Sequence, residues 1–112
     1  MINNYSSFVH KNLQLSQTDI SQICQQWKIK KMSLFGSILR EDFNSNSDID
    51  ILVQFTADAR QGLLTLVKLK HQLEEITHRS IDIVVQESVE NSDNWIRKNE
   101  ILNTAQVIYE QR

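Results

Sequence analysis

The stretch that decides the fold is residues 34–55, LFGSILREDFNSNSDIDILVQF, in which ten residues separate a glycine–serine pair from two aspartates. Asp48 and Asp50 flank Ile49 and lead directly into the apolar run 51–53. Burying ionised carboxylates is strongly unfavourable unless a partner compensates their charge. The stretch therefore predicts a strand whose acids face a compensating ligand.

The two aspartates share one face of the expected strand, because residues two apart in a strand project from the same side. Asp82 repeats the pattern in SIDIVV, residues 80–85, which reads as another strand. If the two strands are neighbours, three carboxylates converge, and each should resist ionising. A divalent cation removes this repulsion, and Mg²⁺ prefers oxygen ligands that include the phosphates of a substrate.

The glycine–serine pair predicts a phosphate site beside these acids. Gly36 ends the strand-like run KMSLF, and Ser37 opens SILREDF, residues 37–43, for which we expect a short helix. Backbone N–H groups at a helix start and a serine hydroxyl suit an anion. Arg40, about one turn further on, can add charge-assisted hydrogen bonds to phosphate oxygens.

Structural roles for the same residues stay open as alternatives. A lone Asp48 could simply begin a strand, and Ser37 could be a helix cap. Arg40 could be a surface arginine paired with Glu41 or Asp42. The recurrence of the acid pattern at Asp82 favours metal binding over these alternatives.

The remaining segments alternate helical and strand patterns. Ser16 and Asp19 predict a capping box for a helix with Ile20, Ile23, Cys24 and Trp27 on one face. Further patterns predict strands at 31–35, 48–55 and 80–85 and a helix at 63–77. A last helix should bury Trp95, Ile101, Leu102, Ala105, Ile108 and Tyr109. This order predicts an α+β (α/β-like) fold, a small mixed sheet of three to four strands with helices packed on it and a right-handed parallel crossover.

Length and composition favour a single domain over 1–112, with residues 1–15 as a flexible or helical N-terminal arm. The net charge of −2 argues against a general nucleic-acid binder, so no direct nucleic-acid binding is expected. Cys24 alone cannot form an internal disulfide and fits a reducing compartment. No signal peptide or membrane span is evident, so we expect a cytoplasmic protein without a membrane partner.

Other chemistries find little support in the sequence. His10, His71 and His78 do not cluster, so a zinc site is not expected. Walker-type loops, GxSxG elbows and Cys/His pairs are absent from the sequence. Trp27, Trp95 and Tyr109 are interpreted as core aromatics, and the lysines of 28–31 as a solvated helix end.

The spacing Gly-Ser, ten residues, Asp-x-Asp resembles the active-site signature of the polymerase-beta-type nucleotidyltransferase superfamily, with Asp82 as its third carboxylate. The resemblance runs over residues 27–109 and is strongest to the minimal nucleotidyltransferase (MNT) proteins, antitoxins encoded beside HEPN-domain ribonucleases. GLLTLVKLKHQLEEITHRSIDIVV looks like their helix and third strand. Glu41 departs from the pattern, since many relatives carry glycine there.

This resemblance implies a polymerase-beta-type core and a two-metal mechanism. Asp48 and Asp50 would bind both Mg²⁺ ions and Asp82 one of them, while Gly36, Ser37 and Arg40 hold the nucleotide. The implied reaction transfers AMP from ATP to a tyrosine of a partner HEPN toxin and releases pyrophosphate. A catalytically idle antitoxin that acts by binding alone, and a small-molecule nucleotidyltransferase, remain as alternatives.

Overall fold

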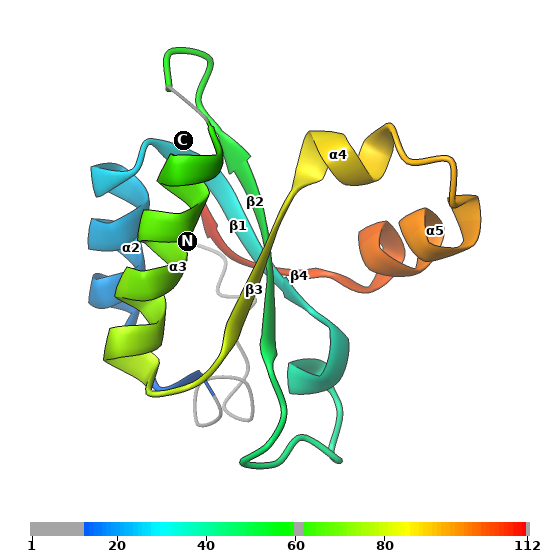
Figure 1. The fold of residues 1–112 in the computed structure, drawn as a ribbon, viewed down its shortest axis with the longest axis horizontal. Coiled ribbons are helices and arrows are strands. Elements are labelled where there is room, and N and C mark those ends of the chain that lie inside the picture. The colour runs from blue at the N-terminus through cyan, green and yellow to red at the C-terminus, as the bar shows by residue number, and fades with distance from the viewer. Residues whose placement is uncertain (1–12, 60–61, 112) are drawn as a thin grey trace.

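A four-stranded mixed sheet in the order β3-β2-β1-β4 forms the centre of the computed structural model, which describes residues 13–59 and 62–111 (Figure 1). The strands are β1 (Ile29–Phe35), β2 (Ile49–Phe55), β3 (Ile81–Val85) and β4 (Gln106–Glu110). β1 is antiparallel to both β2 and β4, whereas β2 and β3 run parallel. The expected mixed sheet and the parallel pair joined by a helix are confirmed.

The helices lie on both faces of the sheet, with α2 and α3 on one side and α4 and α5 on the other (Figure 1). α2 spans Gln17–Gln26 and α3 spans Leu63–Thr77, as predicted. The capping box at α2 is also confirmed, because Ser16 Oγ accepts a hydrogen bond from the Asp19 N–H at 3.0 Å and the Asp19 carboxylate accepts one from the Ser16 N–H at 3.3 Å. None of the described helices is long and apolar enough to cross a bilayer.

The main hydrophobic core fills the space between the sheet and α2 and α3. Its residues on β2, Ile49, Ile51 and Val53, are fully buried. Cys24 of α2 belongs to this core, and burial raises the pKa of its thiol to about 12, so it is a neutral packing residue as expected. Leu13, in the predicted N-terminal arm, is also fully buried, while residues 1–12 of that arm lie outside the described residues.

The C-terminal segment differs from the single long helix that the sequence predicts. The chain forms the short helix α4 (Gln86–Glu90), then α5 (Trp95–Thr104), and then the strand β4. β4 buries Ile108 at its centre, leaves Gln106 and Glu110 exposed at its two ends, and pairs with the outer edge of β1. β-branched and aromatic residues at this end favour a strand, and the free edge of β1 offers the unpaired backbone groups that the strand satisfies.

The prediction that three aromatics belong to the core is correct for two of them. Trp27 and Tyr109 pack partly buried against the main core, and Trp27 Nε1 donates a hydrogen bond to Gln72 Oε1 at 2.8 Å. Trp95 at the start of α5 is 66% exposed, so the prediction was wrong there. The predicted helix joins α5 and β4 and places Trp95 on its buried face. Because the two segments are separate elements, that continuous buried face is not formed.

Candidate active site

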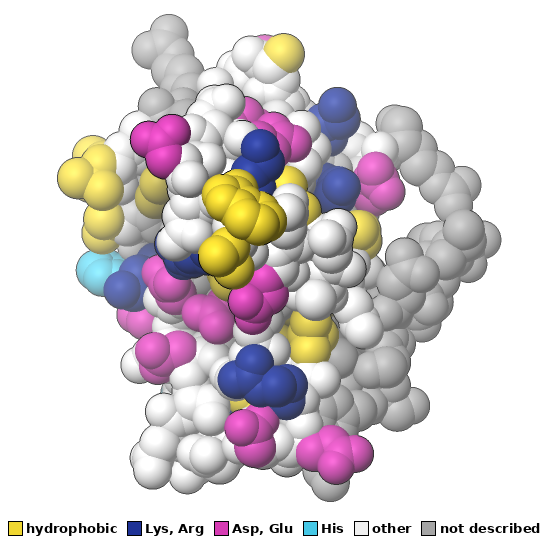
Figure 2. Space-filling model, turned by 90° about the vertical axis from the view of Figure 1, so that its right-hand side faces the viewer, with side chains coloured by type: hydrophobic (Ala, Val, Ile, Leu, Met, Phe, Trp, Pro, Cys, Tyr) yellow, Lys and Arg dark blue, Asp and Glu magenta, His cyan; other side chains and the backbone are white. Residues whose placement is uncertain are grey.

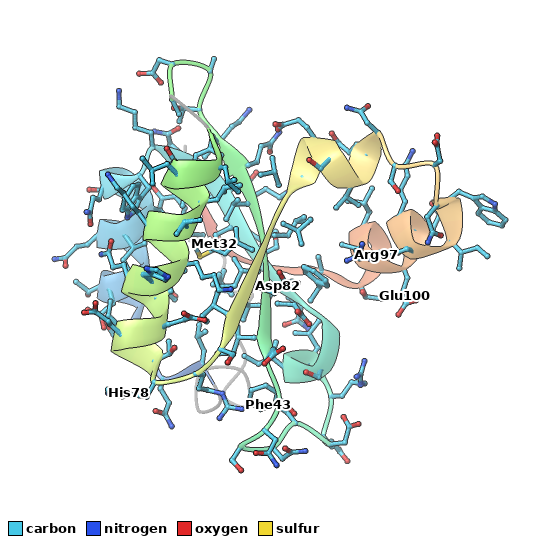
Figure 3. The ribbon with its side chains drawn as sticks, in the orientation of Figure 1. Met32, Phe43, His78, Asp82, Arg97 and Glu100 are labelled. Atoms are coloured by element: carbon cyan, nitrogen blue, oxygen red, sulfur yellow. The ribbon has the colours of Figure 1, made fainter. Side chains whose placement is uncertain are left out.

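Two of the predicted acids lie side by side on neighbouring strands. Asp50 on β2 and Asp82 on β3 are paired in the parallel register, so both side chains project from the same face. That face carries Leu52, which packs in a second hydrophobic cluster with Ile101 of α5. The acids therefore open toward α4 and α5 and away from the main core, as Figure 3 shows for Asp82.

Asp48 completes the acidic patch from the residue just before β2. Asp48 and Asp82 are exposed, whereas Asp50 is half-buried between them. Burial raises the pKa of Asp50 above its ordinary value, and the charges of Asp82 and Asp48 raise it further. The positive charges of Arg97 and Arg40 act in the opposite direction on the same pKa. The structure thus places three carboxylates and two guanidinium groups within electrostatic reach of one another.

The donor set suits Mg²⁺, although the side chains do not form a complete cage. Across 13–59 and 62–111, no three His, Cys, Asp or Glu side chains lie close enough together to hold an ion as they stand. Mg²⁺ is often bound by one or two carboxylates together with the phosphates of a substrate. The oxygen-only pair Asp50 and Asp82 therefore fits a metal that arrives with a nucleotide.

Gly36 connects the glycine–serine turn physically to this pair. Its φ is +77°, in the left-handed region that favours glycine, and a Cβ added there would lie 2.3 Å from Asp50 Oδ2. Any side chain at this position would therefore clash with the carboxylate. The glycine lets the backbone of the turn approach the acid closely.

The turn after Gly36 is shorter than the helix expected over residues 37–43. It is a single 3₁₀ helix, η1 (Gly36–Leu39), which ends where Arg40 returns to extended backbone. Ile38 is fully buried and anchors the turn, while Ser37 Oγ donates a hydrogen bond to the Asp48 carbonyl oxygen at 3.4 Å. The predicted helix stops early because the following residues must return the chain to β2. Gly36, Ser37 and Asp48 are nevertheless brought together.

Arg40 forms the surface ion pair with Asp42 that is the structural alternative to phosphate binding. Its Nε lies 3.3 Å from Asp42 Oδ1, and its side chain is 60% exposed. Glu41 is exposed as well. The predicted phosphate role of Arg40 therefore stays a prediction and requires this exposed pair to separate.

Arg79 holds the loop that leads to Asp48, a role that no sequence pattern indicates. Its guanidinium donates hydrogen bonds to the carbonyl oxygens of Asn44 and Ser47, the latter at 3.0 Å. The same group lies 4.3 Å from the centroid of the Phe43 ring. These contacts fasten the loop between η1 and β2 to the start of β3.

A hollow of about 290 Å³ lies beside the turn and was missed at the level of sequence. It is lined by Phe35 and Gly36 on one side and by four residues of α5 on the other: Arg97, Glu100, Ile101 and Thr104. The spacing of these four residues marks one face of a helix. The same residues also fit the single longer buried helix that the sequence predicts, so the sequence does not reveal their separate face.

A small mixed sheet that places acids of two neighbouring strands against a glycine–serine turn defines a class of nucleotidyl-transfer proteins. The family model described as the nucleotidyltransferase domain matches residues 19–108. The chain therefore belongs to the nucleotidyltransferase domain family. A chain from Methanocaldococcus jannaschii, named as a candidate protein adenylyltransferase (MJ0435), is 40% identical over 77 residues, which cover 69% of this chain and 76% of the relative.

Solved structures share the fold. One is a toxin–antitoxin structure with AMP-PNP, which matches with a TM-score of 0.66 at 19% identity over 88% of this chain and 76% of that one. Another contains the tri-AMPylated HEPN toxin of Shewanella oneidensis in complex with an MNT antitoxin, with a TM-score of 0.59 at 19% identity over 88% and 73%. These similarities confirm the expected nucleotidyltransferase fold.

Proposed function

We propose that this chain is an antitoxin that transfers AMP from ATP to a tyrosine of a HEPN toxin. The observation that carries the proposal is the pairing of Asp50 and Asp82 on one face of the sheet, directly beside Gly36. The relative named as a candidate adenylyltransferase and the AMPylated toxin complex support the reaction and the acceptor. Because the donor is ATP, we expect the reaction to take place in the cytoplasm.

Asp48, Asp50 and Asp82 are the residues that would hold Mg²⁺. The full mechanism uses two of these ions. Bound there, the metal would neutralise phosphate charge and lower the pKa of an incoming hydroxyl. The Gly36–Ser37 turn would orient the triphosphate through its backbone N–H groups and the serine hydroxyl. Arg40 is a further phosphate ligand in this proposal.

The transfer requires an acceptor oxygen in line with the α-phosphorus. The tyrosine oxygen forms the new bond to phosphorus, the bond to pyrophosphate breaks, and Asp82 accepts the tyrosine proton. Asp82 suits this role because it is exposed, whereas Asp50 is half-buried against Gly36. Positioning and charge neutralisation supply most of the rate enhancement in such a reaction.

The decisive experiment mixes the protein with ATP, Mg²⁺ and the protein encoded beside it, which we expect to be a HEPN toxin, followed by intact mass spectrometry of both chains. We expect the neighbour to gain one or more AMP units and its ribonuclease activity to fall. The matched control is the double variant Asp48→Asn and Asp50→Asn, which keeps the side-chain shapes and removes two charges. It should still bind the toxin without modifying it.

Two outcomes would contradict the proposal. If the double variant protects cells from the toxin as well as the wild type, binding alone suffices. If the neighbour binds but gains no mass, while small alcohols become adenylylated in its absence, the acceptor is a small molecule.

A further inference from the structure

The hollow beside Gly36 brings one cation, Arg97, opposite the glycine–serine turn. Its turn side is formed by Phe35 and Gly36, and its helix side includes Arg97 and Glu100. Asn94 fixes the start of α5, because its side chain accepts a hydrogen bond from the Arg97 N–H at 3.1 Å. Arg97 is therefore presented by a capped helix across the hollow from the turn (Figure 3).

Arg97 is better placed to bind the phosphates of a nucleotide than Arg40, the arginine that the sequence pattern indicates. Arg97 lines the hollow beside Gly36, whereas Arg40 does not. Arg40 is engaged by Asp42, whereas Arg97 forms no salt bridge within the part of the chain that the structure describes. Acidic and basic side chains are interspersed on the surface that carries α5 (Figure 2). The binding of phosphate there therefore depends on the position of each cation more than on the net charge of the surface.

We propose that Arg97 is the principal phosphate-binding cation of the site and that the hollow between α5 and Gly36 holds the β- and γ-phosphates of ATP. This inference rests on the proposed function and adds a residue and a subsite to it. A planar guanidinium can bind two phosphate oxygens at once, which suits it to hold the departing pyrophosphate. Glu100, on the same wall, opposes the negative tail and limits its affinity.

The test measures binding without any acceptor. Isothermal titration calorimetry at fixed ionic strength would compare Mg²⁺·AMP-PNP with AMP on the wild type and on Arg97→Ala. Lys98→Ala is the matched control, because it removes a neighbouring positive charge of α5 that does not line the hollow. Arg40→Ala compares the two arginines directly, and circular dichroism checks that each variant is folded.

We expect Arg97→Ala to weaken Mg²⁺·AMP-PNP binding by about tenfold to a hundredfold, the range for one lost charge-assisted hydrogen-bonded contact. AMP binding should change by less than about threefold, since AMP lacks the two phosphates in question, and Arg97→Lys should recover part of the loss. Glu100→Gln should tighten Mg²⁺·AMP-PNP binding a few-fold. Lys98→Ala and Arg40→Ala should each have a smaller effect than Arg97→Ala.

Three results would overturn this role for Arg97: an unchanged affinity in Arg97→Ala, an equal loss for AMP and AMP-PNP, or an equal loss in Lys98→Ala. A wild type that binds no Mg²⁺·AMP-PNP would instead overturn the proposed function itself. A wild type that binds the nucleotide without modifying the toxin would leave the Arg97 result intact. The two proposals can therefore fail separately.

Discussion

At the scale of single residues, Gly36 is where the turn and the acidic patch meet. Its backbone adopts φ +77°, and the Asp50 carboxylate occupies the space that a Cβ would need. The same carboxylate is the half-buried member of the patch and feels the charges of Asp82 and Asp48. A change at Gly36 therefore acts on the backbone of the turn and on the position of the acid together.

We expect Gly36→Ala to lower the free energy of unfolding by about 1–3 kcal/mol, through a strained backbone and a displaced Asp50. Transfer of AMP should fall by about a hundredfold, because a misplacement of about 1 Å is enough for such a loss. Thermal unfolding and the mass-spectrometric transfer assay measure the two effects.

Gly62→Ala is the control for this substitution. Nothing lies within 4 Å of the added Cβ, and the φ of −173° is extended backbone open to any residue. Its stability should stay within about 0.5 kcal/mol of the wild type, with unchanged activity, because the poorer capping by alanine at the start of α3 is offset by the reduced freedom of the unfolded chain. Equal losses in both glycine variants would show that the contact with Asp50 is unimportant.

At the scale of elements, β4 is the feature that local pattern alone misassigned. Its residues fit a helical stripe when they are appended to α5, yet the chain turns at Ala105 and pairs with β1. The pairing covers one edge of the sheet and adds Ile108 to the main core. The turn also leaves α5 free to lie over the acidic face.

Ile108→Ala tests whether β4 belongs to the cooperative core. Removing a side chain that is only 5% exposed should lower the free energy of unfolding by about 2–5 kcal/mol, from lost burial and a residual cavity. The exposed neighbour of the same strand provides the control, since Gln106→Ala should change stability by less than about 0.5 kcal/mol. Urea denaturation of both variants measures the difference, and similar small losses would place β4 outside the core.

At the scale of the whole molecule, the two faces of the sheet have opposite tasks. α2 and α3 lie over one face (Figure 1), which carries a continuous apolar core, and the other face keeps the acidic patch beside α5. Burial of the Asp50 carboxylate and the like charges of Asp82 and Asp48 all oppose its ionisation, and together they raise its pKa. The free protein therefore carries an electrostatic strain that a bound cation would relieve.

Asp50→Asn should make the metal-free protein more stable at neutral pH. Because the pKa of Asp50 is higher in the folded state, the folded chain retains a proton that the unfolded chain releases between the ordinary and the raised pKa. Wild-type stability therefore falls as pH rises through this window, and Asn removes that loss. After allowance for solvent screening, we expect a gain of about 0.5 kcal/mol, or roughly 2–4 °C in melting temperature.

Thermal unfolding in EDTA checks this prediction at neutral and at acidic pH. The difference between variant and wild type should shrink on acidification, as the wild-type carboxyl becomes protonated. Asp48→Asn serves as a comparison at an exposed acid of the same patch and should give a smaller gain. A less stable Asp50→Asn protein at neutral pH would contradict the electrostatic account.

The sequence by itself determined the elements whose signal is local. The helix at Leu63–Thr77, the capping box at Ser16 and the placement of Asp50 between buried Ile49 and Ile51 on β2 follow from periodicity and covalent geometry within a few residues. Tertiary structure decided which distant groups meet: Asp82 beside Asp50, β4 on the edge of β1, and Arg97 across the hollow from Gly36. The physical reason is that a short segment fixes its own period and faces, whereas its neighbours depend on how the whole chain buries its apolar surface and pairs its backbone.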